Sequence, residues 1–270
     1  MTPDDFNYIS ALLKNRSGLV LSQDKAYLLE SRLMPVARNS GMQSVEELIS
    51  KMRMTSDSGL ITNVTEAMTT NESFFFRDQK PFDLFRDELL PELMENRASE
   101  KSMRIWSAAA SSGQEAYTLA ILLKEAGAKM AGWRCDIVGT DISHEILDKA
   151  REGVYTQFEV QRGMPIQLLV KYFDKYDDQW QIKPEIRKSV AFKYFNLLDS
   201  LKPLGKFDIV YCRNVLIYFD PETKTKVLSE IAKIMPPDGM LVLGGAETVL
   251  GISERFTPVK GKRGVYELVQ

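Results

Sequence analysis

The chain has 270 residues, with 35 Lys and Arg against 37 Asp and Glu, for a formal net charge of −2. This balance argues against a protein that coats nucleic acid, because such a protein carries a large excess of positive charge. Hydrophobic residues make up 44% and charged residues 27%, a globular composition that excludes collagen-like, low-complexity and largely disordered chains.

The low cysteine content and the lack of long apolar stretches indicate a protein of a reducing compartment that does not enter a membrane. The two cysteines, Cys135 and Cys212, cannot staple a chain of this length or complete a four-ligand zinc site. The first residues lack the basic and then apolar pattern of a secretion signal, and the longest apolar stretches fall far short of the ~20 residues that span a bilayer. We therefore expect a cytoplasmic protein with no metal ion and no membrane insertion.

Residues 1–69 are predicted to form an all-helical N-terminal domain. Apolar side chains recur there at helical spacing, without the alternation of a strand, at Phe6, Ile9, Leu12, Leu13, Tyr27, Leu28, Leu33, Met34, Val45, Leu48 and Ile49. Ser22 and Ser44 mark expected helix starts, and Glu47 follows Ser44 at the spacing of a capping box. Residues 70–102 hold an aromatic cluster and then apolar residues at helical spacing, which predicts a linker followed by a packing helix.

From residue 103 onward the pattern changes to short apolar runs that alternate with helical segments. Strands are predicted near 104–107, 135–140, 207–212 and 240–244, and helices over 114–126, 144–151 and 222–235. This alternation predicts right-handed crossovers and a mostly parallel sheet, so the fold class is α/β. Two apolar runs joined by a short turn at 261–263 predict a C-terminal antiparallel hairpin that closes the sheet.

The stretch between Gly153 and Leu198 is too long for one crossover helix. It contains a helical pattern at 164–173 and strand-like runs at 180–183 and 190–195. We predict a small antiparallel subdomain, inserted between sheet strands over about residues 154–197.

Ligands of open α/β sheets bind beyond the carboxyl ends of the strands, so the residues after each predicted strand are candidate site residues. The small-residue run 107–113 follows the first strand and would let backbone N–H groups approach a ligand closely. It lacks the glycines of a dinucleotide site, which favours a nucleoside without phosphates over NAD. Small or polar residues also follow the later strands, namely Asp141, Asn196, Leu197, Arg213 and Asn214.

Each of these features has a purely structural alternative. The small-residue turn could serve only tight packing, and Asp141 could cap the helix that begins near His144. An acid after the second strand is, however, the usual partner of a ribose diol. The features together, in strand order, favour one crevice that binds a nucleoside.

A second candidate cluster precedes the sheet, at 71–77. Its three consecutive phenylalanines are expected mainly in the core. A helix that starts there would place Ser73 and Arg77 on one face, where they could line a pocket with Asn71 against the phenylalanine layer.

The chain has a single histidine, His144, which is expected at a surface position in the first turn of a helix. Without a Ser-His pair, a Cys-His pair or a metal cluster, acyl transfer and metal-dependent hydrolysis lack the groups they need. Chemistry with an already activated electrophile remains, because it needs no base.

Four strings carry a family resemblance that spans nearly the whole chain. They are Thr-Thr-Asn-Glu-Ser-Phe-Phe-Phe-Arg-Asp at 69–78, the segment 104–120 around Ser-Ala-Ala-Ala-Ser-Ser-Gly-Gln-Glu, Gly-Thr-Asp-Ile at 139–142, and Phe-Asp-Ile-Val-Tyr-Cys-Arg-Asn-Val-Leu-Ile-Tyr-Phe at 207–219. With these strings the sequence resembles the chemotaxis receptor methyltransferases of the CheR family, which are S-adenosylmethionine-dependent protein-glutamate O-methyltransferases. One departure is Gly-Gly-Ala-Glu at 244–247, where the family has Gly-His-Ser-Glu.

The resemblance implies a helical domain at 1–69, a linker and packing helix at 70–102, and a Rossmann-like methyltransferase domain at 103–270 that contains the inserted subdomain. It implies S-adenosylmethionine as cofactor, with S-adenosylhomocysteine as product. The implied cofactor contacts are Asn71, Ser73, Arg77, Glu115, Asp141, Asn196, Leu197, Arg213 and Asn214. The implied catalytic residues, near the methyl group and the acceptor, are Arg77, Asn214 and Tyr218.

The implied reaction methylates glutamate carboxylates of chemotaxis receptors, as part of adaptation in bacterial chemotaxis. A glutamate with a pKa of ~4.3 is already ionised at neutral pH, so this reaction needs no base. The implied partner is the cytoplasmic helical domain of the receptor, which docks on a basic helix; the helix expected over 22–38 carries Lys25, Arg32 and Arg38.

In some relatives the inserted subdomain holds a glycine-rich loop, and its edge strand pairs with a pentapeptide at the C-terminal tail of the receptor. The equivalent stretch 173–183 contains no glycine, so we predict receptors without this tether. Two other functions are weighed: a non-catalytic S-adenosylmethionine-binding regulator, and a methyltransferase of another protein or of nucleic acid. A nucleic acid partner is disfavoured because 212–215 reads Cys-Arg-Asn-Val rather than Asn-Pro-Pro-Tyr.

Overall fold

The computed structural model describes residues 1–269, which fall into two compact units. The helical unit comprises residues 1–70 together with the segment 218–224. The sheet unit comprises residues 71–217 and the chain from 225 onward. Each unit has its own cluster of buried hydrophobic side chains. The predicted fold class, a helical N-terminal domain followed by an α/β domain, is confirmed.

The helical unit is built from amphipathic helices whose apolar faces meet in one core. They are α1 (Pro3–Ser17), α2 (Tyr27–Asn39), α3 (Val45–Thr55) and α4 (Ser58–Met68). The Ser44 side chain caps α3 by accepting a hydrogen bond from the N–H of Glu47 at 3.1 Å, as the sequence predicts. The helix expected from Ser22 instead begins as a 3-10 turn, η1 (Gln23–Lys25), before α2.

The segment 218–224 folds with the helical unit through backbone and charged contacts. The N–H of Val20 donates to the carbonyl oxygen of Tyr218 at 2.9 Å, and Lys14 pairs with Asp220 at 2.6 Å. The hydrogen bond from Lys14 lowers the pKa of the Asp220 carboxyl well below its usual range. Residues that follow β7 in the sequence are therefore anchored on α1.

The side chain of Arg32, a residue of α2, lies against the C-terminal end of α4. Its guanidinium donates to the carbonyl oxygens of Met68 and Thr69 at 2.8 and 2.9 Å, and to the hydroxyl of Thr70 at 3.2 Å. The last carbonyl groups of a helix lack partners within the helix, and a cation is favourable there. Arg32 is therefore committed to contacts inside the helical unit, although the sequence indicated a basic docking stripe.

The chain enters the sheet unit through an irregular segment. Residues 71–74 have no regular structure and 75–78 form a turn, so the helical start considered at Ser73 is wrong. A helical stretch follows, made of α5 (Lys80–Leu84), the π-helical turn η2 (Phe85–Leu89) and α6 (Leu90–Asn96). Its buried side chains, Phe82, Phe85, Leu89, Leu90 and Leu93, join the core of the sheet unit.

The main sheet has seven strands in the order β6-β2-β1-β7-β8-β10-β9. In chain order these strands are β1 (Ser102–Ala108), β2 (Arg134–Asp141), β6 (Val190–Tyr194), β7 (Ile209–Cys212), β8 (Met240–Leu243), β9 (Phe256–Pro258) and β10 (Val265–Leu268). The first five in the spatial order run parallel, and β10 runs antiparallel to both β8 and β9, which gives the predicted hairpin.

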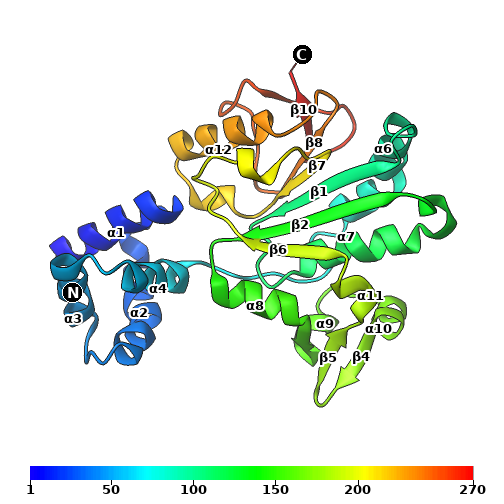
Figure 1. Ribbon diagram of the computed structural model, residues 1–270. Helices are drawn as coiled ribbons and strands as arrows, with labels where there is room; N and C mark the ends of the chain where they lie inside the picture. Colours follow the sequence, from blue (N-terminus) through cyan, green and yellow to red (C-terminus); the bar gives the residue numbers. More distant parts are fainter. Residues whose placement is uncertain (270) are drawn as a thin grey trace. The chain divides into compact units, whose positions relative to one another are not determined.

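Helices join and cover the parallel strands. Helix α7 (Gln114–Glu125) packs on β1, β2 and β6, α8 (His144–Glu152) packs on β2 and β6, and α12 (Pro221–Lys233) connects β7 to β8 (Figure 1). Short 3-10 turns lie at η3 (Gly127–Met130), η4 (Lys202–Leu204) and η5 (Leu216–Tyr218). Strands β7 and β8 are buried along their whole length, as expected for parallel strands covered on both faces.

The inserted subdomain contains a three-stranded antiparallel sheet in the order β3-β5-β4. Its elements are β3 (Val154–Thr156), α9 (Gln157–Gln161), α10 (Ile166–Tyr172), β4 (Phe173–Tyr176), β5 (Gln179–Ile182) and α11 (Pro184–Arg187). The run 190–195, which the sequence analysis placed in this subdomain, forms β6 instead. Strand β6 pairs in parallel with β2, because Val190 to Tyr194 find their partners along Ile137 to Asp141.

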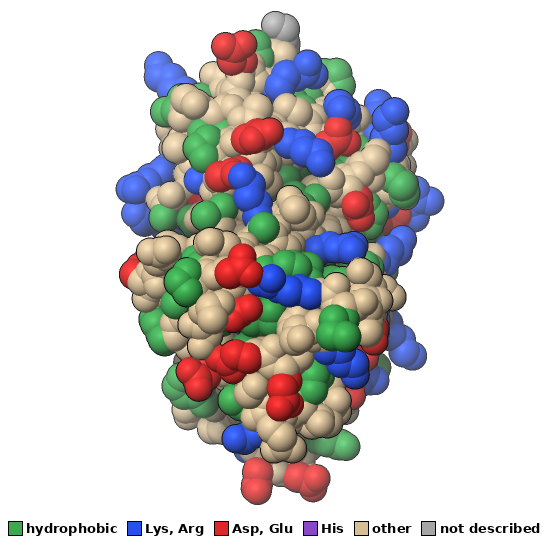
Figure 2. All heavy atoms as spheres, turned by 90° about the vertical axis from the view of Figure 1, so that its left-hand side faces the viewer, with side chains coloured by type: hydrophobic (Ala, Val, Ile, Leu, Met, Phe, Trp, Pro, Cys, Tyr) green, Lys and Arg blue, Asp and Glu red, His purple; other side chains and the backbone are tan. Residues whose placement is uncertain are grey.

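The surface shows no strong separation of charge on the face drawn in Figure 2, where basic and acidic side chains are interspersed. This distribution agrees with a net charge of −2. Among residues 1–269, no helix is long and apolar enough to cross a membrane.

Candidate active site

The site lies at the carboxyl ends of the parallel strands. Strand β1 has β2 on one side and β7 on the other, so the chain order reverses direction at β1. Open α/β sheets bind their ligands at such a switch point, because the loops after the two neighbouring strands diverge there and leave a crevice.

The turn after β1 has an unusual backbone. Ala109, Ser111 and Gly113 have positive φ angles of 55°, 51° and 92°. Alternation of this kind turns successive N–H groups toward one side, and positive φ is unfavourable for the alanine and the serine. Such strain persists only where the surrounding structure holds the turn, and it clusters at functional sites.

Three other segments hold this turn. The N–H of Ser111 donates to the Asp141 carboxylate at 2.9 Å, and the Ser111 hydroxyl donates to the carbonyl oxygen of Asn71 at 2.8 Å. The hydroxyl of Tyr155, from β3 of the insertion, donates to the carbonyl oxygen of Ser112 at 2.7 Å. Complete burial raises the pKa of the Tyr155 phenol well above its usual range, so the phenol remains a donor.

Asp141 ends β2 and is 6% exposed. Its carboxylate accepts hydrogen bonds from the N–H groups of Ser111 and Ser143, at 2.9 and 3.1 Å. The cap of α8 is Ser143, whose hydroxyl accepts the N–H of Ile146 at 3.3 Å. The alternative that Asp141 is merely the cap of this helix is therefore wrong.

Asn196 and Leu197 follow β6, and a backbone hydrogen bond of the preceding residue brings them next to Asp141. The N–H of Phe195 donates to the carbonyl oxygen of Asp141 at 2.9 Å, which continues the pairing of β6 with β2. The Asn196 side chain accepts the N–H of Leu198 at 3.0 Å, and Leu197 is buried.

Segment 71–77 is shaped by its phenylalanines. Phe75 and Phe76 are buried, as expected, and Phe75 packs edge-on against Tyr155 with ring centroids 5.0 Å apart. Gly163 of the insertion approaches the same segment so closely that a Cβ there would lie 2.0 Å from the carbonyl oxygen of Phe75. Only a glycine permits that approach.

The polar residues of this segment are oriented in different ways. Arg77 donates to the carbonyl oxygen of Glu72 at 2.7 Å and lies over the half-buried ring of Phe74, 5.5 Å from its centroid. Arg162 also lies over that ring, at 4.3 Å, and pairs with the Glu72 carboxylate at 2.6 Å. Ser73, between Glu72 and Phe74 in the irregular stretch, is half-buried.

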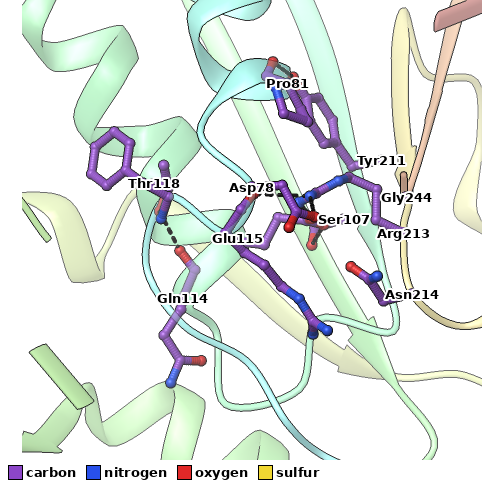
Figure 3. Close-up of polar contacts among 12 residues, drawn as sticks. Asp78, Pro81, Ser107, Gln114, Glu115, Thr118, Tyr211, Arg213, Asn214 and Gly244 are labelled. Carbon is purple, nitrogen blue, oxygen red and sulfur yellow. Dashed lines mark hydrogen bonds and ion pairs between the residues drawn. The ribbon is translucent and has the colours of Figure 1, made fainter. Parts of the chain in front are cut away.

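Arg213, after β7, is the buried centre of a charge network (Figure 3). Its side chain is 1% exposed and pairs with Glu115 at 2.9 Å and with Asp78 at 2.8 Å. It also donates to the carbonyl oxygen of Arg77 at 2.9 Å. The second oxygen of Glu115 accepts the hydroxyl of Ser107 at 2.8 Å, so the network joins β1, α7, β7 and the entry segment.

Asn214 follows in the left-handed conformation, with φ 59°. Its N–H donates to the carboxylate of Glu247 at 2.8 Å. Glu247 was not among the predicted site residues; its signals were an acid among small residues shortly after β8 and its place at the end of the string 244–247, where the resembled family also has a glutamate.

Tyr218 differs from the other predicted site residues, because it belongs to the helical unit and they belong to the sheet unit. His144 is exposed and stacks on Tyr194, with ring centroids 4.2 Å apart. Within residues 1–269, no cluster of three or more His, Cys, Asp or Glu side chains is placed to hold a metal ion.

Comparison with known proteins extends over the whole chain. The all-alpha domain of CheR methyltransferases matches residues 4–69, and the S-adenosylmethionine-binding domain of CheR methyltransferases matches residues 71–265. A chemotaxis protein methyltransferase of Pseudomonas aeruginosa is 40% identical over 267 residues, which cover 97% of this chain and 96% of the relative.

Two further relatives agree in length and name. A chemotaxis protein methyltransferase of Pseudomonas putida is 38% identical over 265 residues, 97% of this chain and 96% of the relative. One of Vibrio cholerae is 37% identical over 268 residues, 98% of this chain and 96% of the relative. With both domains matched in order and over nearly full length, the chain belongs to the CheR methyltransferase family, the S-adenosylmethionine-dependent methyltransferases of chemotaxis.

Proposed function

We propose that this protein methylates glutamate carboxylates in the cytoplasmic helical domain of chemoreceptors, and that it does so in the cytoplasm. The products are a glutamate γ-methyl ester and S-adenosylhomocysteine. The observation that carries the proposal is the pair of fixed carboxylates, Asp141 and Glu115, on either side of the strained turn after β1. The site contains no histidine or thiolate base, and ionised glutamate needs none.

The strand-end residues fit a nucleoside that carries a charged amino acid tail. Asp141 is a buried carboxylate beside backbone N–H groups, which suits a ribose diol. Glu115 accepts one hydrogen bond on each oxygen, from Ser107 and from Arg213. Since an ionised carboxylate offers about four acceptor positions, Glu115 keeps capacity for an ammonium group. Asn196 and Leu197 are assigned to the adenine.

S-adenosylmethionine, when bound, supplies a methyl group on a sulfonium, which is an activated electrophile. The residues of this chain bind and orient the cofactor and the acceptor, and they exclude water. Arg77 and Asn214 are assigned both to the cofactor and, next to its methyl group, to the acceptor carboxylate; guanidinium groups bind carboxylates with paired N–H donors. Tyr218 is assigned to the acceptor as well. Arg213 has its guanidinium turned to Glu115 and Asp78, so its assigned role is to hold those groups in place.

The test is methyl transfer from labelled S-adenosylmethionine to a purified receptor cytoplasmic fragment. We expect label in the fragment that alkali releases as methanol, because esters hydrolyse under alkali and methylated amines do not. The matched control is a fragment whose acceptor glutamates are replaced by glutamine. Cofactor binding without any transfer to the fragment would favour a non-catalytic regulator, and equal labelling of both fragments would refute glutamate as the acceptor.

We also propose that receptor recognition does not use a C-terminal pentapeptide. The connection between β4 and β5 is the two-residue loop 177–178, in which Asp177 takes the positive φ of 51°. Strand β4 lies at the edge of its sheet but has four residues, and a two-residue loop adds no further length to the edge on which a peptide would pair. Titration with the peptide Asn-Trp-Glu-Thr-Phe should show no binding below millimolar concentration, while a receptor without the tail is fully methylated. Low micromolar binding would contradict this.

A further inference from the structure

Glu247 is a buried carboxylate at the end of β8 that has no role in the proposed reaction; the residue is 9% exposed. Its Oε2 accepts hydrogen bonds from the N–H groups of Asn214 and Gly244, both at 2.8 Å. Its Oε1 accepts those of Val215 and Ile217, at 3.0 and 3.3 Å. These bonds use the roughly four acceptor positions that an ionised carboxylate offers, so Glu247 has none left for a ligand.

Three of these donors belong to the loop 214–217, which follows β7 and carries Asn214. Asn214 adopts a left-handed conformation, which asparagine tolerates better than most residues with a side chain but which contacts around it still have to hold. Hydrogen bonds to a carboxylate are shorter and stronger than those between neutral groups. Glu247 thus supplies the restraint that this backbone conformation requires.

Gly244 shows how closely the parts fit. A Cβ on Gly244 would lie 2.7 Å from the Glu247 carboxylate and 3.0 Å from the side-chain nitrogen of Asn214. The absence of a side chain at this position lets the carboxylate and the Asn214 amide both approach the end of β8. The Asn214 side chain therefore lies against the end of β8, next to the carboxylate that binds the Asn214 N–H.

We infer that Glu247 is a positioning residue that holds Asn214 in its binding conformation. The purpose of that conformation rests on the proposed function, whereas the placement of Asn214 by Glu247 does not.

The test is a double-mutant cycle on S-adenosylhomocysteine binding, measured by calorimetry. Glu247→Gln keeps the size of the side chain but turns one acceptor into a donor that faces two N–H groups. We expect Glu247→Gln and Asn214→Ala each to weaken binding about tenfold. If Glu247 acts through Asn214, the double variant binds less than fivefold more weakly than Asn214→Ala alone.

The matched control is Glu159→Gln in the inserted subdomain. Glu159 also accepts a backbone N–H, that of Thr156 at 2.9 Å, and the substitution is the same, but affinity should stay within about twofold. Circular dichroism and a thermal melt accompany each variant. Should Glu247→Gln not fold, Gly244→Ala replaces it in the cycle, because its Cβ displaces the same carboxylate.

If the double variant binds the product fivefold or more weakly than Asn214→Ala alone, the two substitutions act independently and the inference is overturned. Unchanged affinity in a folded Glu247→Gln variant would overturn it as well. Product binding requires no receptor, so the cycle decides the role of Glu247 even if the wild-type protein methylates no receptor. That last result would refute the proposed function alone.

Discussion

The loops that follow β1 and β7 share one device. Each lies at the end of a parallel strand, and each contains a residue other than glycine with positive φ, Ser111 in the first and Asn214 in the second. Each is held by a carboxylate from the end of the neighbouring strand, Asp141 after β2 and Glu247 after β8.

The two acids differ in how much of their hydrogen-bonding capacity the loop uses. Glu247 accepts four backbone N–H groups, and its loop has the Arg213 ion pairs as a second anchor. Asp141 is the acid assigned to the ribose, and its loop is braced additionally by Tyr155 and Asn71. The loop after β7 thus gives Glu247 three of its N–H groups, whereas the loop after β1 gives Asp141 the N–H of Ser111 and is bound to two further segments.

The largest expected effect comes from removing the second anchor of the β7 loop. Arg213→Met leaves the mostly buried Glu115 carboxylate without its counter-charge, which should lower the free energy of unfolding by about 3–5 kcal/mol. The measurement is urea unfolding followed by circular dichroism. The variant Arg213→Met/Glu115→Gln should recover at least half of the loss, because the uncompensated charge is gone. A single variant as stable as the wild type would show that the ion pair does not anchor the loop.

The next effect tests whether Asp141 serves a ligand as well as its loop. Asp141→Ala should weaken S-adenosylhomocysteine binding by roughly 1.5–3 kcal/mol, because charge-assisted hydrogen bonds to the ribose are lost. Calorimetry gives the affinity, and a thermal melt reports stability. Ser143→Ala is the matched control: it removes the true cap of α8, costs about 1 kcal/mol of stability and leaves affinity unchanged. Wild-type affinity in a folded Asp141→Ala protein would remove Asp141 from the site.

A smaller effect tests the brace that the insertion gives to the β1 turn. Tyr155→Phe leaves the buried carbonyl oxygen of Ser112 without the phenol donor, which should cost about 1–2 kcal/mol of stability. Because the turn is strained, cofactor affinity should fall about threefold in the same variant. Tyr172→Phe, which removes an insertion phenol bonded to Glu125 instead, is the control and should leave affinity unchanged. Equal affinities in both variants would mean that Asp141 holds the turn unaided.

The smallest effect lies outside both loops, in the helical unit. Arg32→Gln should cost about 1 kcal/mol of stability, because the carbonyls at the end of α4 lose a charged donor. Arg38 is exposed on α2, the helix that carries Arg32, so Arg38→Gln should leave the free energy of unfolding unchanged. If α2 docks on receptors, Arg38→Gln lowers methylation in a salt-sensitive way at unchanged stability. A fully stable Arg32→Gln variant with reduced methylation would return Arg32 to the docking surface.

Local patterns in the sequence were sufficient for much of the fold. Helical spacing, the capping serine Ser44 and the alternation of strands and helices depend on neighbours within a few residues, so they can be recognised without knowledge of distant contacts. The C-terminal hairpin was predicted for the same reason. The candidate residues at the strand ends, Asp141, Asn196, Leu197, Arg213 and Asn214, followed from a single topological rule, that loops after parallel strands meet at one edge.

Other features depended on partners far away in the chain, and there the sequence was insufficient. The run that forms β6 reads as a strand, but only its pairing with β2 places it in the main sheet rather than in the insertion. Segment 71–77 contains residues at helical spacing, yet packing of Phe75 against Tyr155 and Gly163 holds it irregular. Arg32 occupies a position in the helical pattern of α2 at which apolar residues recur, and tertiary contacts direct its side chain to the end of α4.

The sequence by itself therefore determined most of the helices and strands, their order, and which polar residues follow the parallel strands, because side-chain periodicity and turn chemistry are local properties. Only the tertiary structure decided what each charged side chain does there. Arg213 turns inward to Glu115 and Asp78, and Glu247 binds the loop after β7. The physical reason is that a buried charge must be paired and hydrogen-bonded, and its partners come from whichever segments the fold brings within reach.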